Sequence, residues 1–229
     1  NPRAAGMVNG ILRNLERSLD SLPAIPRENP VSYLSVLYSH PEWLVEEFLT
    51  ALGSEETARL LAANNSQAPI TAMVNTTKTT AEGLAEALAG EGVTARPHPW
   101  LADCLILSKT GNLERLAAFQ EGLFYVQDPA SKLSALALGP EPGMRVLDCC
   151  AAPGGKSFAA AIQMEGGGEV ISCDLHPHKK KLIQAGADRL GLKNITPLTA
   201  DGKAVRPQWE NAFDRVLVDA PCSGLGVIR

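Results

Sequence analysis

The most informative stretch of this chain is Asp148-Cys-Cys-Ala-Ala-Pro-Gly-Gly-Lys156-Ser157. It begins at the end of an apolar run, Met144–Cys149, that has the composition of a buried strand, and a helical pattern follows it as far as Gln163. A glycine-rich turn between a strand and a helix is typical of open α/β sheets, which bind ligands at the carboxyl ends of their strands. The stretch therefore predicts the first strand of a parallel sheet and a ligand-binding turn.

Strands and helices alternate after this turn. Strands are predicted at 169–174, 195–200 and 214–220, and a helix ends at Leu190 between the first two. This alternation predicts a parallel sheet with helices on both faces. The chain stops nine residues after Ala220, where a doubly wound sheet usually continues. We therefore infer that the chain is a fragment of a longer protein whose sheet is truncated after the fourth strand.

The segment from Ile70 to Val126 has a different pattern. Strands are predicted at 70–75, 93–97, 104–108 and 123–126, with helices at 79–89 and 112–119; a capping box of Thr79 and Glu82 begins the first helix. This β-α-β-β-α-β order predicts a ferredoxin-like α+β unit. The third strand, Cys-Leu-Ile-Leu-Ser, has no aromatic residue that could stack on RNA bases, which favours a packing role.

The beginning of the chain is predicted to be helical. Apolar residues recur at helical spacing over 9–22, and a proline-rich stretch at 23–30 predicts a stiff linker. A second helix is predicted from 41 to 52, with Gly53 ending it and another helix following through Ala63. The first helix is too short to be stable alone, so it is expected to be the end of a larger helical domain.

Composition excludes several classes of protein. The 229 residues are 45% hydrophobic and 20% charged, which is ordinary for a globular protein. The five cysteines show no CxxC or Cys/His spacing, which argues against a disulfide scaffold or a zinc site and for a reducing cytoplasm. No apolar run reaches the roughly 18 residues of a membrane span, and no signal peptide is seen.

Charge is distributed unevenly. The net charge of −4 argues against a nucleic-acid binder, but 14 acidic and 9 basic residues lie before Gln127, against 11 acidic and 12 basic residues after Val126. The second half is therefore mildly basic. Lys179–Lys181 are expected on a solvent-exposed helix face, with a phosphate contact to RNA as the alternative.

Three further strands end in an acidic residue. Asp174 ends the second strand, Asp201 ends the third, and Asp219 ends the fourth. A carboxylate at such a strand end can accept hydrogen bonds from ribose hydroxyls. Three acids beside a glycine-rich turn predict a pocket for a nucleoside cofactor.

The fourth strand end also carries a cysteine, in Asp219-Ala-Pro-Cys222-Ser223-Gly224. The preceding proline and the strand end predict that Cys222 faces the pocket. A thiolate can add to C6 of a pyrimidine and so make C5 nucleophilic toward a methyl donor. Asp219 could then bind the base near N3 or N4.

Two other classes of function stay open at this point. Gly155-Lys156-Ser157 matches the end of a P-loop, and Val216–Asp219 resembles a magnesium-binding strand, but Cys150 stands where the first P-loop glycine is required. A P-loop-like NTPase would bind ATP with magnesium. A non-catalytic RNA-binding or ribosome-assembly module would bind RNA without a cofactor.

The two long motifs resemble those of the NOL1/NOP2/Sun family of RNA cytosine-5 methyltransferases. Gln127-Asp-Pro-Ala-Ser131 is similar to that family too, and the resemblance extends from Ser32 to Arg229. Residues Ala5–Arg13 resemble the closing helix of the NusB-like domain of Sun-type bacterial enzymes, which methylate 16S ribosomal RNA. The linker segments His40–Leu44 and Asn65–Ser66 also resemble that type.

The resemblance implies a class I methyltransferase fold with a Rossmann-like sheet, S-adenosylmethionine as the cofactor and RNA, expected to be 16S rRNA, as the partner. Another rRNA or a tRNA is the alternative substrate. The resemblance also divides the chain into three parts: a NusB-like helix at 1–22, linker helices and a ferredoxin-like subdomain at 23–126, and the start of the methyltransferase domain at 127–229. A cytoplasmic monomer without a metal or a membrane contact is expected.

The resemblance also implies the roles of site residues. Cys222 matches a family cysteine that helps to release the product, with Asp219 beside it, whereas related DNA methyltransferases use the Pro-Cys cysteine as the nucleophile. The nucleophilic cysteine of the family lies in a downstream motif, beyond Arg229. The residues that match the family's cofactor contacts are Cys150, Ala151, Ala152, Pro153, Gly154, Gly155, Lys156, Asp174, Asp201 and Asp219.

Overall fold

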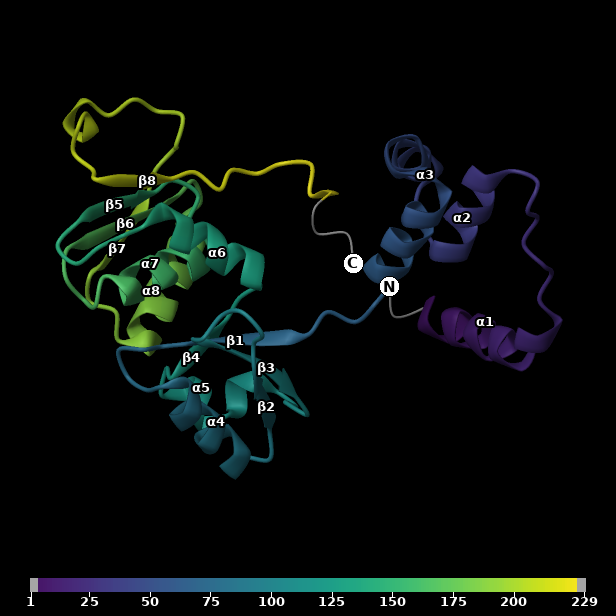
Figure 1. Ribbon diagram of the computed structural model, residues 1–229, viewed down its shortest axis with the longest axis horizontal. Helices are drawn as coiled ribbons and strands as arrows, with labels where there is room; N and C mark the ends of the chain where they lie inside the picture. Colours follow the sequence, from purple (N-terminus) through teal and green to yellow (C-terminus); the bar gives the residue numbers. More distant parts are fainter. Residues whose placement is uncertain (1–3, 226–229) are drawn as a thin grey trace. The chain divides into compact units, whose positions relative to one another are not determined.

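The computed structural model describes residues 4–225 (Figure 1). The chain divides into two compact units, with the boundary between Gln67 and Ala68. Within the described residues, no helix has both the length and the apolar character needed to cross a membrane.

The first unit consists of helices. They are α1 (Ala5–Arg17), followed by the short 3-10 helix η2 (Leu19–Ser21), α2 (Pro30–Tyr38) and α3 (Glu42–Asn64). Leu34, Val45 and Leu61 form the core between α2 and α3. Gly53 interrupts α3 with a positive φ of 78°, so the predicted break between two helices at this glycine is confirmed.

Helix α2 corrects the prediction of a plain linker at Pro30. Asn29 caps the helix, because its side-chain oxygen accepts hydrogen bonds from the N–H groups of Val31 at 2.9 Å and Ser32 at 3.2 Å. Pro30 stands at the first helical position, where its missing N–H group costs nothing. The proline therefore begins a helix instead of excluding one.

The second unit begins with the ferredoxin-like part. Its elements are β1 (Ile70–Val74), α4 (Ala81–Gly90), β2 (Thr94–Pro97), β3 (Cys104–Ser108), η3 (Leu113–Arg115), α5 (Ala117–Gln120) and β4 (Phe124–Val126). The strands form an antiparallel sheet in the order β2-β3-β1-β4, which confirms the predicted ferredoxin-like fold.

Two local predictions within this part are wrong. Thr80, not Thr79, caps α4, since its hydroxyl accepts from the N–H group of Gly83 at 3.1 Å. The helix predicted at 112–119 is split into η3 and α5, because Leu116 has an extended backbone with φ −68° and ψ 133°.

The rest of the second unit is a parallel sheet with its helices. Its elements are α6 (Pro129–Leu138), β5 (Arg145–Asp148), α7 (Gly155–Gln163), β6 (Glu169–Asp174), α8 (Pro177–Leu190), β7 (Ile195–Thr199), η4 (Pro207–Trp209) and β8 (Arg215–Leu217). All neighbouring strands are parallel, in the order β7-β6-β5-β8. This sheet has the Rossmann-like topology expected of a class I methyltransferase.

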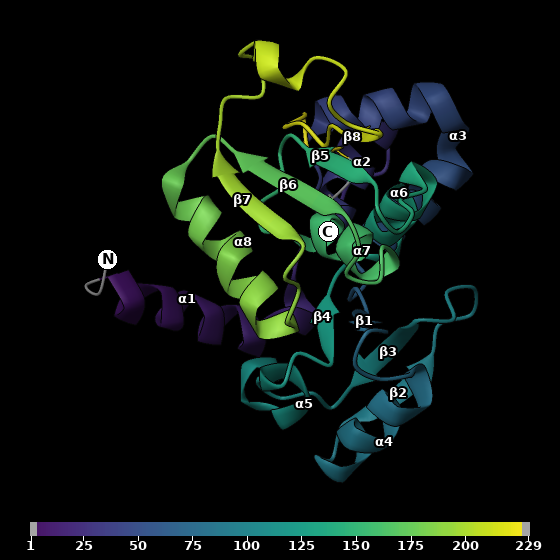
Figure 2. The same ribbon diagram turned by 90° about the vertical axis from the view of Figure 1, so that its left-hand side faces the viewer.

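The two faces of the parallel sheet are covered differently (Figure 2). Helices α7 and α8 pack on one face, against Val146 and Val170. On the other face, Trp209 and Phe213 from the β7–β8 connection pack against Ile171. Among the described residues the second face thus carries only the short helix η4, so the prediction of helices on both faces holds for one face.

The ferredoxin-like sheet is itself covered on both faces. Leu84 and Leu88 of α4 pack on one face, while Cys104 and Tyr125 on the other face belong to the same core as Phe158 of α7. The rings of Tyr125 and Phe158 meet edge to face, with centroids 5.9 Å apart. The packing role predicted for the third strand is therefore confirmed.

Candidate functional site

The glycine-rich turn runs from the end of β5 to the start of α7. Gly154 has φ +116°, and a Cβ there would lie 2.3 Å from the Phe158 ring, so only glycine fits. The N–H group of Ala151 donates to the carbonyl oxygen of Cys173 at 2.7 Å, which ties the turn to β6. The Ala152–Pro153 peptide bond within the turn is cis.

Asp148 lies beneath this turn and is only 1% exposed. The Ser157 hydroxyl donates to its carboxylate at 2.8 Å, and the Ser172 hydroxyl donates to Ser157 at 2.8 Å. Burial raises the pKa of Asp148 to about 6, although the Ser157 hydrogen bond and the charge of Lys156 oppose this rise. A buried chain of hydrogen-bonded polar side chains therefore supports the turn. Ionisation of the Asp148 carboxyl in this chain is unfavourable, because burial disfavours the charged form.

Asp174 is held at the end of β6 with its side chain 8% exposed. Its two carboxylate oxygens accept hydrogen bonds from the N–H groups of Ala152 at 3.4 Å and His176 at 3.3 Å. The Lys179 ammonium lies 3.6 Å from the same carboxylate. This buried acid thus links the glycine-rich turn to the start of α8.

A pocket of about 730 Å³ opens at the carboxyl ends of the strands. Six of the predicted site residues line it: Cys150, Ala152, Asp174, Asp201, Asp219 and Cys222. They come from the ends of all four parallel strands, although they are spread over more than 70 residues of sequence. A volume of this size is within the range of pockets that bind small molecules and cofactors.

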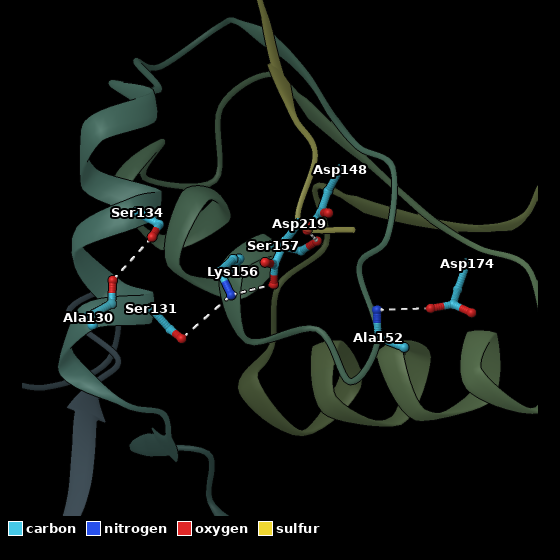
Figure 3. Close-up of polar contacts among 9 residues, drawn as sticks. All are labelled: Ala130, Ser131, Ser134, Asp148, Ala152, Lys156, Ser157, Asp174 and Asp219. Carbon is cyan, nitrogen blue, oxygen red and sulfur yellow. Dashed lines mark hydrogen bonds and ion pairs between the residues drawn. The ribbon is translucent and has the colours of Figure 1, made fainter. Parts of the chain in front are cut away.

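The other predicted residues support this pocket from behind. Ala151, Pro153, Gly154 and Gly155 shape the turn, and they are absent from the pocket lining. Lys156 is also absent from the lining. Its Nζ atom lies 2.6 Å from the Asp219 carboxylate and 3.5 Å from the Ser131 hydroxyl (Figure 3).

Asp201 and Cys222 lie at the exposed rim. The Asp201 carboxylate accepts from the N–H group of Lys203 at 2.9 Å, which fixes the start of the β7–β8 connection. Cys222 is exposed, and its sulfur lies 3.4 Å from the N–H group of Gly224. The cysteine is therefore accessible from the pocket, as its position after a strand-end proline predicted.

The remaining cysteines have the character of neutral thiols. Burial raises the pKa of Cys104 to about 11 and that of Cys173 to about 12. Burial and the neighbouring charge of Asp148 raise the pKa of Cys149 and Cys150 as well. Of these five cysteines, Cys222 is the one that is exposed.

Sequence reasoning did not assign several lining residues to the site. They include Leu175, His176, Lys179 and Lys203. The expected solvent-exposed face of Lys179–Lys181 is confirmed, since Lys180 and Lys181 are exposed and the Lys179 side chain is 41% exposed; Lys179 also lies beside Asp174. The short spacing between Asp174 and Lys179 could have predicted this contact. The first turn of a helix that directly follows a strand-end acid lies beside that acid.

Two family models match consecutive parts of the chain. Residues 40–114 match the ferredoxin-like domain of RsmF/B-like methyltransferases, and residues 135–229 match the 16S rRNA methyltransferase RsmB/F model. The chain belongs to the RsmB/F family.

Curated members of the RsmB/F family are similar over the whole chain. The probable ribosomal RNA small subunit methyltransferase B of Bacillus subtilis is 43% identical over 98% of this chain and 50% of its own length. The ribosomal RNA small subunit methyltransferase B of Vibrio cholerae is 36% identical over 100% of this chain and 51% of its own length. The chain therefore spans about half the length of these relatives.

Two solved structures are similar to most of this chain. The crystal structure of the protein named PH0851 is 31% identical, with a TM-score of 0.82 over 93% of this chain and 48% of that chain. A methyltransferase homolog from Pyrococcus horikoshii is 26% identical, with a TM-score of 0.73 over 85% of this chain and 64% of that chain.

Proposed function

We propose that the complete protein transfers a methyl group from S-adenosylmethionine to C5 of a cytosine in 16S rRNA in the cytoplasm, and that this chain holds the cofactor pocket. The observation that carries the proposal is the pocket in which Cys150, Asp174, Asp201 and Asp219 meet at the ends of the four parallel strands, with Cys222 in the same lining. Membership of the RsmB/F family and the names of the curated relatives support a methyltransferase that acts on small-subunit rRNA.

The residues of the pocket fit this cofactor. The two Asp174 oxygens are oriented by backbone N–H groups, with the Lys179 ammonium 3.6 Å from one of them, and the other oxygen retains a lone pair that can accept a ribose hydroxyl. Asp201 lines the same pocket from the end of the next strand, and we assign to it the contact with the adenine base. The glycine-rich turn contributes Cys150 and Ala152 to the pocket lining, where the amino-acid end of the ligand would be held. The cofactor supplies the methyl group.

The same site offers groups for the cytosine. Methylation at C5 needs a thiolate that adds to C6 and a base that later removes the C5 proton. We assign to Asp219 the contact with N3 or N4 of the base, and to Cys222 a role in product release. The nucleophilic cysteine is expected in the part of the protein beyond Arg229. The target base must leave its stack to enter.

The domain division at 22/23 and 126/127 belongs to the same proposal. In it, α1 closes a NusB-like domain, and residues 127–229 begin the methyltransferase domain. Direct evidence would come from limited proteolysis of the complete protein, with cleavage expected near 23–30.

Calorimetry on the 229-residue chain tests the proposed cofactor. S-adenosylhomocysteine, which lacks the reactive methyl group, is expected to bind, whereas ATP with magnesium is not. Asp174→Asn should weaken binding by about tenfold or more, because a charged acceptor of a ribose hydroxyl is lost. Asp188→Asn is the matched control, since this aspartate lies on the exposed side of α8.

Other outcomes would contradict the proposal. Tight ATP binding without S-adenosylhomocysteine binding would favour the NTPase, and RNA binding without either ligand would favour the non-catalytic module. Turnover of RNA by the purified chain would show that Cys222 suffices as the nucleophile and would end its assignment to product release.

A further inference from the structure

The segment Gln127–Lys132 carries the motif Gln-Asp-Pro-Ala-Ser, to which the proposed function assigns no role. It joins β4 to the first turn of α6. Gln127 continues the pairing with the ferredoxin-like sheet, because its N–H group donates to Thr71 at 3.3 Å and its carbonyl oxygen accepts from the Thr71 hydroxyl at 2.5 Å. Asp128 then caps α6 by accepting from the N–H group of Ala130 at 2.8 Å. The start of the segment is thus fixed to the sheet and to the first turn of α6.

Lys132 anchors α6 to the ferredoxin-like part. Its side chain is 3% exposed, and its ammonium lies 2.7 Å from the carboxylate of Asp103 in the β2–β3 connection. A buried ion pair of this kind adds little to stability compared with apolar residues of similar size. The pair instead specifies the position of α6, since the buried Lys132 ammonium is stabilised only where it lies beside the Asp103 carboxylate.

Ser131, the preceding residue on α6, faces the other way, toward the candidate site. Its hydroxyl lies 3.5 Å from the Lys156 ammonium, at the long end for a hydrogen bond, and Asp219 holds the same ammonium at 2.6 Å (Figure 3). The Gln127 side chain also packs here, because a Cβ on Gly155 would lie 2.9 Å from its amide nitrogen. The segment therefore contacts two consecutive residues of the glycine-rich motif.

Lys156 needs such support. A lysine ammonium is a point charge on a flexible four-carbon stem with three donors, so a single partner does not fix its position. Asp219 offers little restraint of its own, because its side chain is 56% exposed while that of Lys156 is 17% exposed. A second contact, from Ser131 on α6, restricts the motion of the Lys156 ammonium. Through this ammonium it also restricts the Asp219 carboxylate, which lines the pocket.

We propose that Ser131 is a positioning residue for the Lys156–Asp219 pair and that the Lys132–Asp103 pair holds α6 in the place from which Ser131 acts. The ferredoxin-like part thereby sets the direction of a carboxylate in the pocket. This proposal rests on the proposed function only in assuming that the pocket binds the cofactor. The position of the Lys156 ammonium can be measured without any ligand.

The test uses nuclear magnetic resonance spectra that select the ammonium groups of lysines, recorded on the 229-residue chain without ligand at mildly acidic pH and low temperature. Lys156→Arg identifies the signal of Lys156. Ser131→Ala should accelerate hydrogen exchange of this ammonium with water about threefold to fivefold, as expected for the loss of one weak hydrogen bond. Ser131→Thr keeps a hydroxyl and should restore the slow exchange.

Ser134→Ala is the matched control, because Ser134 lies on the same helix and its hydroxyl donates to the Ala130 carbonyl oxygen at 3.1 Å (Figure 3). It should leave the Lys156 signal unchanged. The double variant Lys132→Met with Asp103→Asn removes both buried charges and should accelerate the exchange like Ser131→Ala.

Two results would overturn the proposal: an unchanged Lys156 signal in Ser131→Ala, or equal effects of Ser131→Ala and Ser134→Ala. An unchanged signal in the double variant would overturn the role of the Lys132–Asp103 pair. Failure of S-adenosylhomocysteine to bind would refute the proposed function and leave this measurement intact.

Discussion

The buried Asp148 should make the stability of this chain depend on pH in a direction opposite to that of an ordinary salt-bridged acid. Burial raises its pKa from the ordinary value of 3.8 to about 6 in the folded chain. Because the folded pKa is the higher one, stability is greatest while Asp148 is protonated and falls as the pH rises from 3.8 through about 6. The full loss is about 3 kcal/mol, at roughly 1.36 kcal/mol per pKa unit.

Asp148→Asn removes this titration while it keeps an acceptor for the Ser157 hydroxyl. The amide changes the local hydrogen bonds by an amount that does not depend on pH, so the informative quantity is the change with pH. The free energy of unfolding of the variant should rise relative to that of the parent chain by about 2 kcal/mol between pH 4.5 and pH 8. These two values lie on either side of the sequence pI of about 5.6, where solubility is lowest.

The assay is urea unfolding of both proteins, followed by circular dichroism at each pH. Asp188→Asn serves as the control for the loss of an exposed aspartate and should show no such trend. If the difference between Asp148→Asn and the parent chain stays constant with pH, or shrinks toward pH 8, then burial does not dominate the ionisation of Asp148 and the reasoning is wrong.

Three further changes test other parts of the second unit. Gly154→Ala should lower the free energy of unfolding by at least about 2 kcal/mol in urea, because the new Cβ would lie 2.3 Å from the Phe158 ring at a positive φ. Iodoacetamide should label Cys222 well before Cys173, whose pKa burial raises to about 12, and peptide mass spectrometry would detect the order. Arg189→Lys should cost about 1–3 kcal/mol in thermal unfolding, since it breaks two hydrogen bonds to carbonyl groups of the ferredoxin-like part.

The site was predictable from sequence because its acids mark the ends of strands. Asp174 and Asp219 follow apolar runs, and the carboxyl ends of parallel strands meet at one edge of a sheet, so local patterns implied a common pocket. The same reasoning could not show where the long Lys156 side chain points. Motif matching predicts that it belongs to the cofactor contacts, and in the structure its ammonium lies between Asp219 and Ser131. That direction depends on α6, a neighbour that no local pattern reveals.

The two helices that sequence reasoning missed share one local signal. Asn29-Pro30 begins α2, and Asp128-Pro129 begins α6. In each pair the first side chain accepts hydrogen bonds from free N–H groups of the first turn, and proline occupies the position that needs no donor. Reading Pro30 as a linker residue ignored the Asn before it. The capping pair was therefore stronger evidence than the proline content of the stretch.

The ferredoxin-like sheet also supports the glycine-rich turn through its contact with the side chain of Phe158. The ring of Phe158 occupies the space in which a Cβ on Gly154 or on Gly186 of α8 would lie, at 2.3 and 2.4 Å from its nearest atoms. On its other side it meets the ring of Tyr125, which belongs to β4. A displacement of β4 would therefore move the residue that shapes the turn. Because Tyr125 and Cys104 are buried in the core that they share with Phe158, this face of the sheet is part of the scaffold that supports the pocket.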